Sequence, residues 1–346
     1  MTSKLLPSDS CRHGGCTLTG ALSATTHVRD AVSLIHGPKG CTHHNFSLLH
    51  ATAAENDQLA VPSLVSTNLA ESEIIFGGER VLANVLKSVA RRDIGAIYVL
   101  STCVIETIGD DVAGICREEY GVPVVRIPTA GFLGGTFQGG LNNALCAIAS
   151  EEKPCTKSFS VNIIGEKNLE YEVEENYQEV ARLLALIGLS VNLRFIRNCD
   201  TTSIGKLGAA GLNILRDNEL QPTGEFLMQM FGTPYIASFP VGLGGTIQFM
   251  EAVGTMCGID FREAIASEKE LQESMLADFS DIAGEHIRGI PHGSQGGSSQ
   301  VAGELAVRLG LKIGSDGPQI PVPFDPPIGS AGVRRLLHRW RCAIHA

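Results

Sequence analysis

The chain has 346 residues, of which 44% are hydrophobic and 18% are charged. This length predicts two or three domains, and this composition excludes a disordered protein. The formal net charge of −10 argues against a nucleic-acid partner, because neutralising phosphates requires a basic surface, while a basic protein partner stays compatible. Basic residues crowd only near the C-terminus, at Arg334, Arg335, Arg339 and Arg341.

The sequence shows no signal for a membrane or for secretion. No apolar run reaches the roughly 18 residues that a membrane-spanning helix needs, and the N-terminus lacks the apolar stretch of a signal peptide. We therefore expect a cytoplasmic protein without a membrane partner. Thiols stay reduced in that compartment, so the 10 cysteines are not expected to form a disulfide framework. They serve either as small buried residues or as metal ligands.

In the first part of the chain, apolar runs alternate with amphipathic stretches. A helix is predicted around 79–92, followed by the buried strand AIYVLST (96–102), a helix around 105–120 and the strand PVVRIPT (123–129). This βαβ pattern predicts a parallel sheet with helices on both faces.

The same pattern starts again after the charged, proline-containing segment EEKPCTK (151–157). Strands are predicted at 159–165, 189–196, 211–215 and 234–238, and helices at 173–187 and 223–231. Beyond residue 266 the pattern weakens: helices are predicted at 269–282 and 299–309, with a Gly- and Ser-rich stretch at 288–300 and a Pro-rich one at 318–329. We predict an α/β fold of repeated doubly wound, Rossmann-like domains, with boundaries at 1–155, 156–265 and 266–346.

Three cysteines stand where loops are expected. Cys41 follows a strand end at which Gly37, Pro38 and Gly40 form a tight turn, Cys103 follows the strand AIYVLST, and Cys16 lies in a glycine-flanked segment. Ligands collect at the carboxyl ends of parallel strands, and iron–sulfur clusters require thiolates, four for a [4Fe–4S] cluster. The separations of 25 residues (16 to 41) and 62 residues (41 to 103) are far longer than those in zinc ribbons or bacterial ferredoxins. Spacing alone therefore leaves inert buried cysteines as an equal alternative.

Four motifs, taken together and in this order, resemble the nitrogenase component 1 family. They are HGPKGC (36–41), STNLAESEIIFGGE (66–79), LSTCVIETIGDD (100–111) and EYGVPVVRIPTAGFLGG (119–135). That family includes the nitrogenase catalytic subunits, the scaffold on which the nitrogenase cofactor is assembled, and dark protochlorophyllide reductase. The cysteine spacing is most similar to the alpha-type subunits, above all to that of the assembly scaffold.

The resemblance implies a site and partners. Cys16, Cys41 and Cys103 would hold a [4Fe–4S] or related cluster at a subunit interface, and the partner chain would supply the remaining ligand. Gly37, Pro38 and Gly40 would shape the ligand loop. Cys11 lies close by in sequence, and it is open whether it is a fourth ligand, an alternative to Cys16 or neither.

The implied activity is that of a redox subunit paired with itself or with a homologous beta-type chain. It would accept electrons from an ATP-hydrolysing iron protein, and the chain has no GxxxxGK[ST] motif with which to bind the nucleotide itself. Two alternatives stay open. One is a cofactor-assembly scaffold without turnover, and the other is a non-redox assembly protein whose thiols hold zinc or nothing.

Two departures from the family argue against dinitrogen reduction. The catalytic subunits hold their large cofactor through a cysteine after the strand GLNIL and a histidine in the last domain. Here the first position is Asp217, and no histidine occurs between His292 and His338. A carboxylate is a hard ligand and a poor replacement for thiolate. The third domain also looks shortened, with little sequence between 278–284 and 297–311.

Further polar residues have a structural and a functional interpretation. His43 and His50 share one helical face and predict either iron or proton chemistry or a polar helix start. The following residues are expected to be structural: Glu71, Glu73, Gly77 and Gly78 as a loop or docking surface near the cluster, Asp110 and Asp111 at a helix start, Cys116 in the core, and Cys146, Cys155 and Cys257 without a ligand role. Cys199 is expected to be the most open of the later cysteines.

Overall fold

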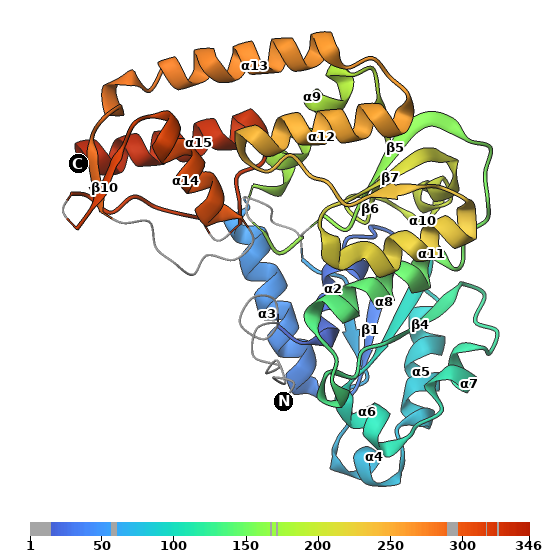
Figure 1. The fold of residues 1–346 in the computed structure, drawn as a ribbon. Coiled ribbons are helices and arrows are strands. Elements are labelled where there is room, and N and C mark those ends of the chain that lie inside the picture. The colour runs from blue at the N-terminus through green and yellow to red at the C-terminus, as the bar shows by residue number, and fades with distance from the viewer. Residues whose placement is uncertain are drawn as a thin grey trace, which may run out of the picture. The chain divides into compact units, whose positions relative to one another are not determined.

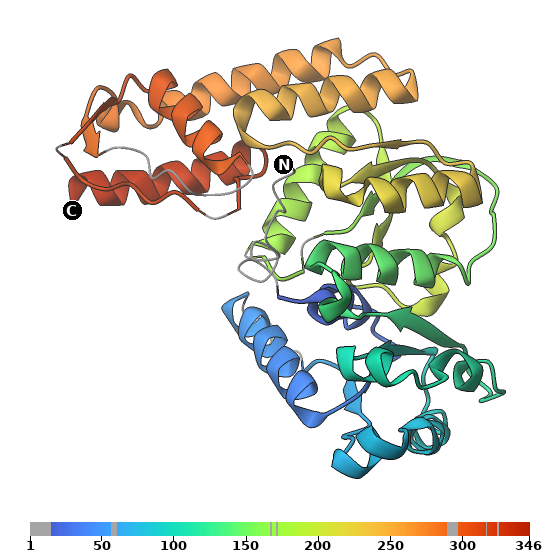
Figure 2. The same cartoon turned by 60° about the horizontal axis from the view of Figure 1, so that its bottom comes forward.

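The computed structural model describes residues 15–56, 61–166, 168–170, 172–288, 297–315, 317–323 and 325–346. The chain divides into two compact units, shown in Figures 1 and 2. The first consists of 1–171 and 192–237, and the second of 172–191 and 238–346. Within the described parts of the chain, no helix combines the length and the apolar character that crossing a membrane would take.

The first unit begins with a four-stranded parallel sheet in the order β2-β1-β3-β4. Its strands are β2 (Leu64–Ser66), β1 (Ala31–His36), β3 (Ala96–Ser101) and β4 (Val124–Pro128). Every residue of β1 and β3 is buried, which is the pattern of strands covered on both faces. In the register of this pair, His36 stands opposite Ser101, so the two strands end side by side. The predicted parallel sheet is confirmed.

Helices cover both faces of this sheet. Side chains on one face of β1 and β3 pack with α2 (Thr17–Thr25) and α8 (Phe137–Ala149), and those on the other face pack with α5 (Glu79–Val89) and α7 (Val112–Cys116). The contact of α2 with α8 is unusually close. A Cβ on Gly20 would come within 1.9 Å of the Phe137 carbonyl oxygen, and one on Gly140 within 1.9 Å of the Thr17 carbonyl oxygen. Two glycines thus let the helix backbones touch.

One predicted helix is wrong in this region. The continuous helix expected around 105–120 is two short ones, α6 (Cys103–Ile108) and α7. Gly109, with φ +80°, ends α6 in the left-handed conformation, and the Asp111 carboxylate starts α7 by accepting from the Gly114 N–H.

A second parallel sheet, in the order β6-β5-β7-β8, also belongs to the first unit. Its strands are β6 (Ser190–Phe195), β5 (Ser158–Ile164), β7 (Ala210–Leu215) and β8 (Tyr235–Ile236), and α10 (Thr201–Ile204) and α11 (Gln221–Phe231) accompany them. The hydrophobic core that lies under α2 and α8 continues into this sheet through Ile164 and Leu215, and into α11 through Leu227. The predicted repetition of Rossmann-like sheets is confirmed, while the three-domain division stays a prediction.

The second unit is mainly helical. It contains α9 (Val173–Leu186), α12 (Gly242–Cys257), α13 (Arg262–Ala277), α14 (Ser298–Arg308) and α15 (Gly329–His345), together with the short parallel pair β9 (His286–Arg288) and β10 (Lys312–Gly314). Trp340 of α15 is fully buried in its core and donates its indole N–H to the Pro321 carbonyl at 2.8 Å.

The basic cluster predicted near the C-terminus lies on the exposed side of α15 and is paired with acids. Arg335 and Arg339 contact Glu172, Arg341 contacts Asp281, and Arg334 lies 3.6 Å from Asp278. Each of these arginines therefore has a carboxylate partner within the second unit, and such solvent-exposed pairs add little stability.

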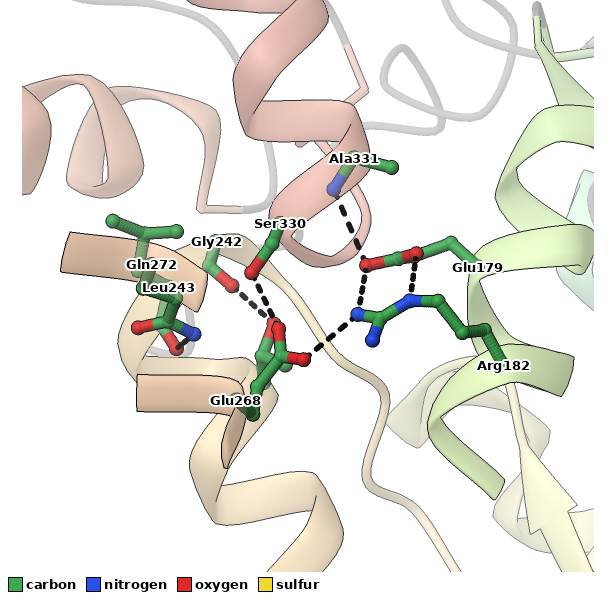
Figure 3. A network of polar contacts seen from close by, with 9 residues as sticks. Glu179, Arg182, Gly242, Leu243, Glu268, Gln272, Ser330 and Ala331 are labelled. Atoms are coloured by element: carbon green, nitrogen blue, oxygen red, sulfur yellow. Dashed lines mark hydrogen bonds and ion pairs between the residues drawn. The ribbon is translucent and has the colours of Figure 1, made fainter. Parts of the chain in front are cut away.

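A polar network ties α9, α13 and α15 together inside the second unit (Figure 3). Arg182 lies between two carboxylates, with its Nε 2.8 Å from Glu179 and its Nη2 2.9 Å from Glu268. Glu179 and Glu268 are only 4% and 1% exposed. The network extends to the first turn of α15, where the Ser330 hydroxyl donates to Glu268 at 2.6 Å and the Ala331 N–H to Glu179 at 3.2 Å. The hydrogen bonds that Arg182 donates to Glu179 raise the pKa of its guanidinium, so it stays charged.

Replacing Arg182 should destabilise the second unit. In Arg182→Met, two buried carboxylates lose their cation, and we expect a loss of about 2–3 kcal/mol in the free energy of unfolding, less than for a fully buried pair because Arg182 is partly solvated. Urea titration followed by circular dichroism measures this loss. The matched control is Arg308→Met, which removes the exposed pair with Glu273 and should cost below about 1 kcal/mol. Equal losses in the two variants would contradict the structural role of the network.

Candidate functional site

Each of the three predicted cysteine ligands stands at the start of a helix. Cys16 is the N-cap of α2, Cys41 is the third residue of α3 (Lys39–Glu55), and Cys103 is the first residue of α6. α3 follows β1 and α6 follows β3, and these strands are neighbours in the sheet. The parallel sheet therefore carries Cys41 and Cys103 to one edge, and the close packing of α2 on α8 holds Cys16.

Cys16 and Cys103 both lie within electrostatic reach of the Cys41 thiol. Burial raises the pKa of the Cys41 thiol, and negative charge on Cys16 and on Cys103 raises it further. The 3₁₀ turn η1 (Gly131–Leu133) passes between the other two: a Cβ on Gly131 would lie 3.5 Å from the Cys16 Cβ and 3.7 Å from the Cys103 Sγ. The Phe132 N–H donates to the Cys103 Sγ at 3.4 Å. Residues 87 positions apart in sequence (16 to 103) thus flank one glycine.

The three cysteines match an iron–sulfur group in ligand type, because such a group requires thiolates. Among the described residues, no group of three or more His, Cys, Asp or Glu side chains could hold a single metal ion. Burial is the largest cause of the raised pKa of Cys41, and negative charge on Cys16 and Cys103 adds to it; a bound iron–sulfur group would supply compensating positive charge. Gly131 leaves space between Cys16 and Cys103, because it has no side chain.

The loop before Cys41 is built around Gly37. A Cβ there would come within 2.2 Å of the Thr102 hydroxyl oxygen. The Gly37 N–H donates to the Thr67 hydroxyl at 3.0 Å, and its carbonyl accepts from the Leu69 N–H at 3.1 Å. Gly40, by contrast, lies in the first turn of α3 with open space where a Cβ would be. Of the residues predicted to shape the ligand loop, Gly37 has a clear steric reason, and Pro38 serves as the N-cap of α3.

Substituting the two glycines should have unequal effects. In Gly37→Ala the new methyl group overlaps Thr102, so the loop must shift, and we expect a loss of about 1–3 kcal/mol in the free energy of unfolding. Gly40→Ala should be neutral or slightly stabilising, because alanine is the better helix former and meets nothing. Chemical denaturation of both variants provides the comparison, and a larger loss in Gly40→Ala would refute this account of the loop.

His36 is a site residue that sequence reasoning missed. It ends β1, is fully buried, and links three segments around the ligand loop. Its Nδ1 lies 3.1 Å from the Thr67 hydroxyl, and its Nε2 lies 3.3 Å from the Asp110 carboxylate, which also accepts from the Gly78 N–H at 2.9 Å. The turn at Gly77–Gly78 thus connects to the cysteine loop through Asp110 and His36. The available signal was a histidine within a buried strand, directly before the glycine of HGPKGC.

The contribution of His36 to stability should depend on pH. Burial lowers its pKa from the ordinary 6.5, and the Asp110 hydrogen bond opposes this only in part. The folded chain therefore keeps His36 neutral while the unfolded chain takes up a proton, so stability holds above about pH 6.5 and falls as the pH drops from there towards the lower folded-state pKa.

The measurement compares His36→Asn with the unmodified protein by denaturant titration between pH 8 and pH 5, about the range over which histidine titrates. The difference between their free energies of unfolding should shrink as the pH falls, since the variant escapes the cost of keeping an imidazole neutral. His43→Asn is the control, because His43 is exposed on α3. A difference that does not vary with pH would show that His36 acts by packing alone.

The other predicted residues are placed as follows. His43 and His50 are exposed, and the His50 ring stacks on Phe46 at 6.0 Å, which supports the structural interpretation of α3. The Glu73 carboxylate accepts from the Ala70 N–H at the start of α4 (Glu71–Phe76). Asp111 begins a helix as expected, whereas Asp110 instead joins His36 to Gly78. Cys11 lies outside the described residues.

The expectation for Cys199 is wrong. Its side chain is only 3% exposed, and burial raises its pKa to about 12. The segment is buried because Cys199 forms a β-bridge with Val28, and its carbonyl accepts from the Arg29 N–H. Of the cysteines that the structure describes, Cys155 and Cys342 are exposed, while Cys116 is buried as predicted.

Asp217 caps a short helical turn. It is the N-cap of the 3₁₀ turn η3 (Asn218–Leu220) directly after β7, and its carboxylate accepts from the Glu219 N–H at 2.9 Å. At the strand end where the resemblance would put a cofactor thiolate, the chain thus carries a turn-forming carboxylate. His292, from which the histidine-free part of the sequence was counted, lies outside the described residues.

Comparison with known proteins identifies the family. Residues 16–287, well over half of the chain, match the family described as Nitrogenase component 1 type Oxidoreductase. This chain belongs to that family. The nitrogenase component 1 motifs recognised in the sequence all lie within the matched residues.

Relatives with two different names match about equally well. The nitrogenase iron-molybdenum cofactor biosynthesis protein NifE of Clostridium pasteurianum is 26% identical over 290 residues, covering 82% of this chain and 62% of that protein. The nitrogenase molybdenum-iron protein alpha chain of Methanothermobacter marburgensis is 26% identical over 282 residues, covering 75% of this chain and 58% of that protein. The chain therefore spans about three fifths of the length of these relatives.

A solved structure supports the fold. The chain titled "Nitrogenase Cp1 at pH 6.5" superimposes with a TM-score of 0.65 at 20% identity, covering 87% of this chain and 60% of that chain. At this identity the similarity shows the α/β fold, and the roles of individual residues rest on this chain's own geometry.

Proposed function

We propose that this chain is an iron–sulfur subunit of a nitrogenase-like complex. Cys16, Cys41 and Cys103 hold a [4Fe–4S] or related cluster, and a second chain, either a copy of this one or a homologous beta-type subunit, supplies the remaining ligand. The observation that carries the proposal is the placement of three thiols from three separate segments: charge on Cys16 and on Cys103 reaches Cys41, and Gly131 lies beside both Cys16 and Cys103. Family membership adds to it.

The cluster, when bound, stores and passes on single electrons, and the chain's residues hold it in place. Cys16, Cys41 and Cys103 bind it as thiolates, η1 closes over Cys103 through the Phe132 N–H, and Gly37 lets the loop of Cys41 approach Thr102. An ATP-dependent iron protein is the proposed electron donor, because the sequence has no GxxxxGK[ST] motif of its own.

A cofactor-assembly role is the second candidate. The scaffold-like spacing of the cysteines and relatives named for cofactor biosynthesis favour it, while Asp217, which caps η3 where a thiolate would be needed to hold a large cofactor, weakens it. In that role the chain would carry a cofactor precursor and release it. Dinitrogen reduction by this chain is not proposed.

The first test is the metal content of anaerobically purified protein. We expect about four irons and four acid-labile sulfides per cluster, with an EPR signal after dithionite reduction. Cys103→Ala should lose most of this iron, because a cluster left with two of this chain's three thiolates is held weakly. Cys146→Ala is the matched control, since Cys146 is also half-buried but interacts with Thr223 instead. Zinc or no metal, unchanged in Cys103→Ala, would contradict the proposal and favour a non-redox assembly protein.

Turnover separates the redox subunit from the scaffold. With the iron protein, ATP and a small reducible substrate such as acetylene, a redox subunit should consume electrons in the presence of substrate, and Cys103→Ala should not. A pure scaffold should bind iron and sulfide in the same amounts but show no substrate reduction.

A further inference from the structure

Three buried threonine hydroxyls without a hydrogen-bond partner stand next to the three cysteines. Among the described residues, the buried hydroxyl oxygens that lack any partner are those of Thr17, Thr42 and Thr102. Thr17 follows Cys16, Thr42 follows Cys41, and Thr102 precedes Cys103. Burying a hydroxyl without a hydrogen bond costs about 1–3 kcal/mol, so three such groups at one site need an explanation.

Thr102 departs from the usual behaviour of its position. It is the N-cap of α6, where a threonine side chain normally accepts a hydrogen bond from the helix backbone, yet it makes none. Thr136, the N-cap of α8, makes that bond with the Gly139 N–H at 2.9 Å. The Thr102 side chain is 1% exposed and lies against Gly37 in the loop that leads to Cys41. Its hydroxyl is therefore kept at the site without serving the helix.

The hydroxyls of Thr42 and Thr17 also lack the hydrogen bond that a buried threonine hydroxyl usually makes. Thr52 on α3 and Thr107 on α6 donate to the carbonyl four residues earlier, at 3.0 Å and 2.8 Å, whereas Thr42 makes no such bond. Thr17 is 3% exposed, and its hydroxyl oxygen lies 3.6 Å from the point at which a Gly131 Cβ would stand. That point is also 3.5 Å from the Cys16 Cβ and 3.7 Å from the Cys103 Sγ, so the Thr17 hydroxyl and both cysteines lie around Gly131.

We propose that the hydroxyls of Thr17, Thr42 and Thr102 donate hydrogen bonds to the sulfurs of the iron–sulfur group that Cys16, Cys41 and Cys103 hold. This inference rests on the proposed function. Sulfides and thiolates are acceptors, and a hydroxyl always has a proton to donate. These threonines are positioning residues rather than ligands: they orient their O–H groups towards the sulfurs and stabilise the form of the group that carries more negative charge.

The expected consequence is a higher reduction potential than the cysteines alone would set. Reduction adds one negative charge to the group, and O–H donors stabilise that charge, since charge-assisted hydrogen bonds are the strong ones. Each lost donor should lower the ratio of reduced to oxidised group at a fixed potential by roughly threefold to tenfold, and tenfold corresponds to about 59 mV for a one-electron couple.

The experiment is a potentiometric titration monitored by EPR on the anaerobically purified full chain with its partner. Thr17→Val, Thr42→Val and Thr102→Val keep the shape and remove the hydroxyl, and each should shift the midpoint potential downwards while retaining the iron. Thr102→Ser restores a donor and should return the potential towards that of the unmodified protein. Thr107→Val is the control: its hydroxyl is already bonded to the Cys103 carbonyl, so the midpoint potential should not move.

The outcomes separate this inference from the proposed function. If the unmodified protein contains iron and sulfide but the three valine variants titrate at its potential, the hydroxyls do not reach the sulfurs and this inference alone fails. The same holds if Thr107→Val shifts the potential as much as Thr102→Val. If the unmodified protein contains no iron and sulfide, the proposed function fails, and the inference fails with it. If a valine variant loses iron, the serine variant at the same position is measured as well. The hydroxyl is the cause only if the serine variant keeps its iron.

Discussion

The parallel pairing of β1 with β3 is the constraint on which the site depends. It runs over six residue pairs and ends with His36 opposite Ser101, so the chain leaves both strands at the same edge of the sheet. The segments that follow carry Cys41 and Cys103 at the starts of α3 and α6. A slip of one residue would exchange the side chains that pack against the two helix layers, so the packing of both layers holds the register.

Around this edge, glycines let backbone segments approach one another more closely than residues with a side chain would allow. Gly20 and Gly140 let α2 touch α8, which holds Cys16, and Gly37 lets the loop of Cys41 approach Thr102. His36 then joins that loop to Asp110 and so to the turn at Gly78. Hydrogen bonds thus link the loops around the thiols to one another, and such support gives a bound group a defined geometry.

The second unit is stabilised by a buried ion-pair network and a small apolar core. Arg182, between Glu179 and Glu268, joins three helices through buried charge, and Trp340 fills the centre of a small apolar core. The sequence pattern did not predict α12 or α15, because glycines interrupt the apolar period of the former and prolines precede the latter. The arginines of α15, conspicuous in the sequence as a basic cluster, are neutralised by Glu172, Asp278 and Asp281 only after folding.

By itself, the sequence determined the class of fold and the family. Apolar runs such as AIYVLST, alternating with amphipathic stretches, predict buried strands of a parallel sheet. Four motifs in order indicated the nitrogenase component 1 family. It also named three candidate ligands, whose role stays a prediction. Only the tertiary structure decided that Cys199 is buried, that Asp110 serves His36, and that three threonine hydroxyls stand unpaired beside the cysteines. The physical reason is that burial and hydrogen-bond satisfaction depend on residues distant in sequence, whereas periodicity and motif order are local properties of the chain.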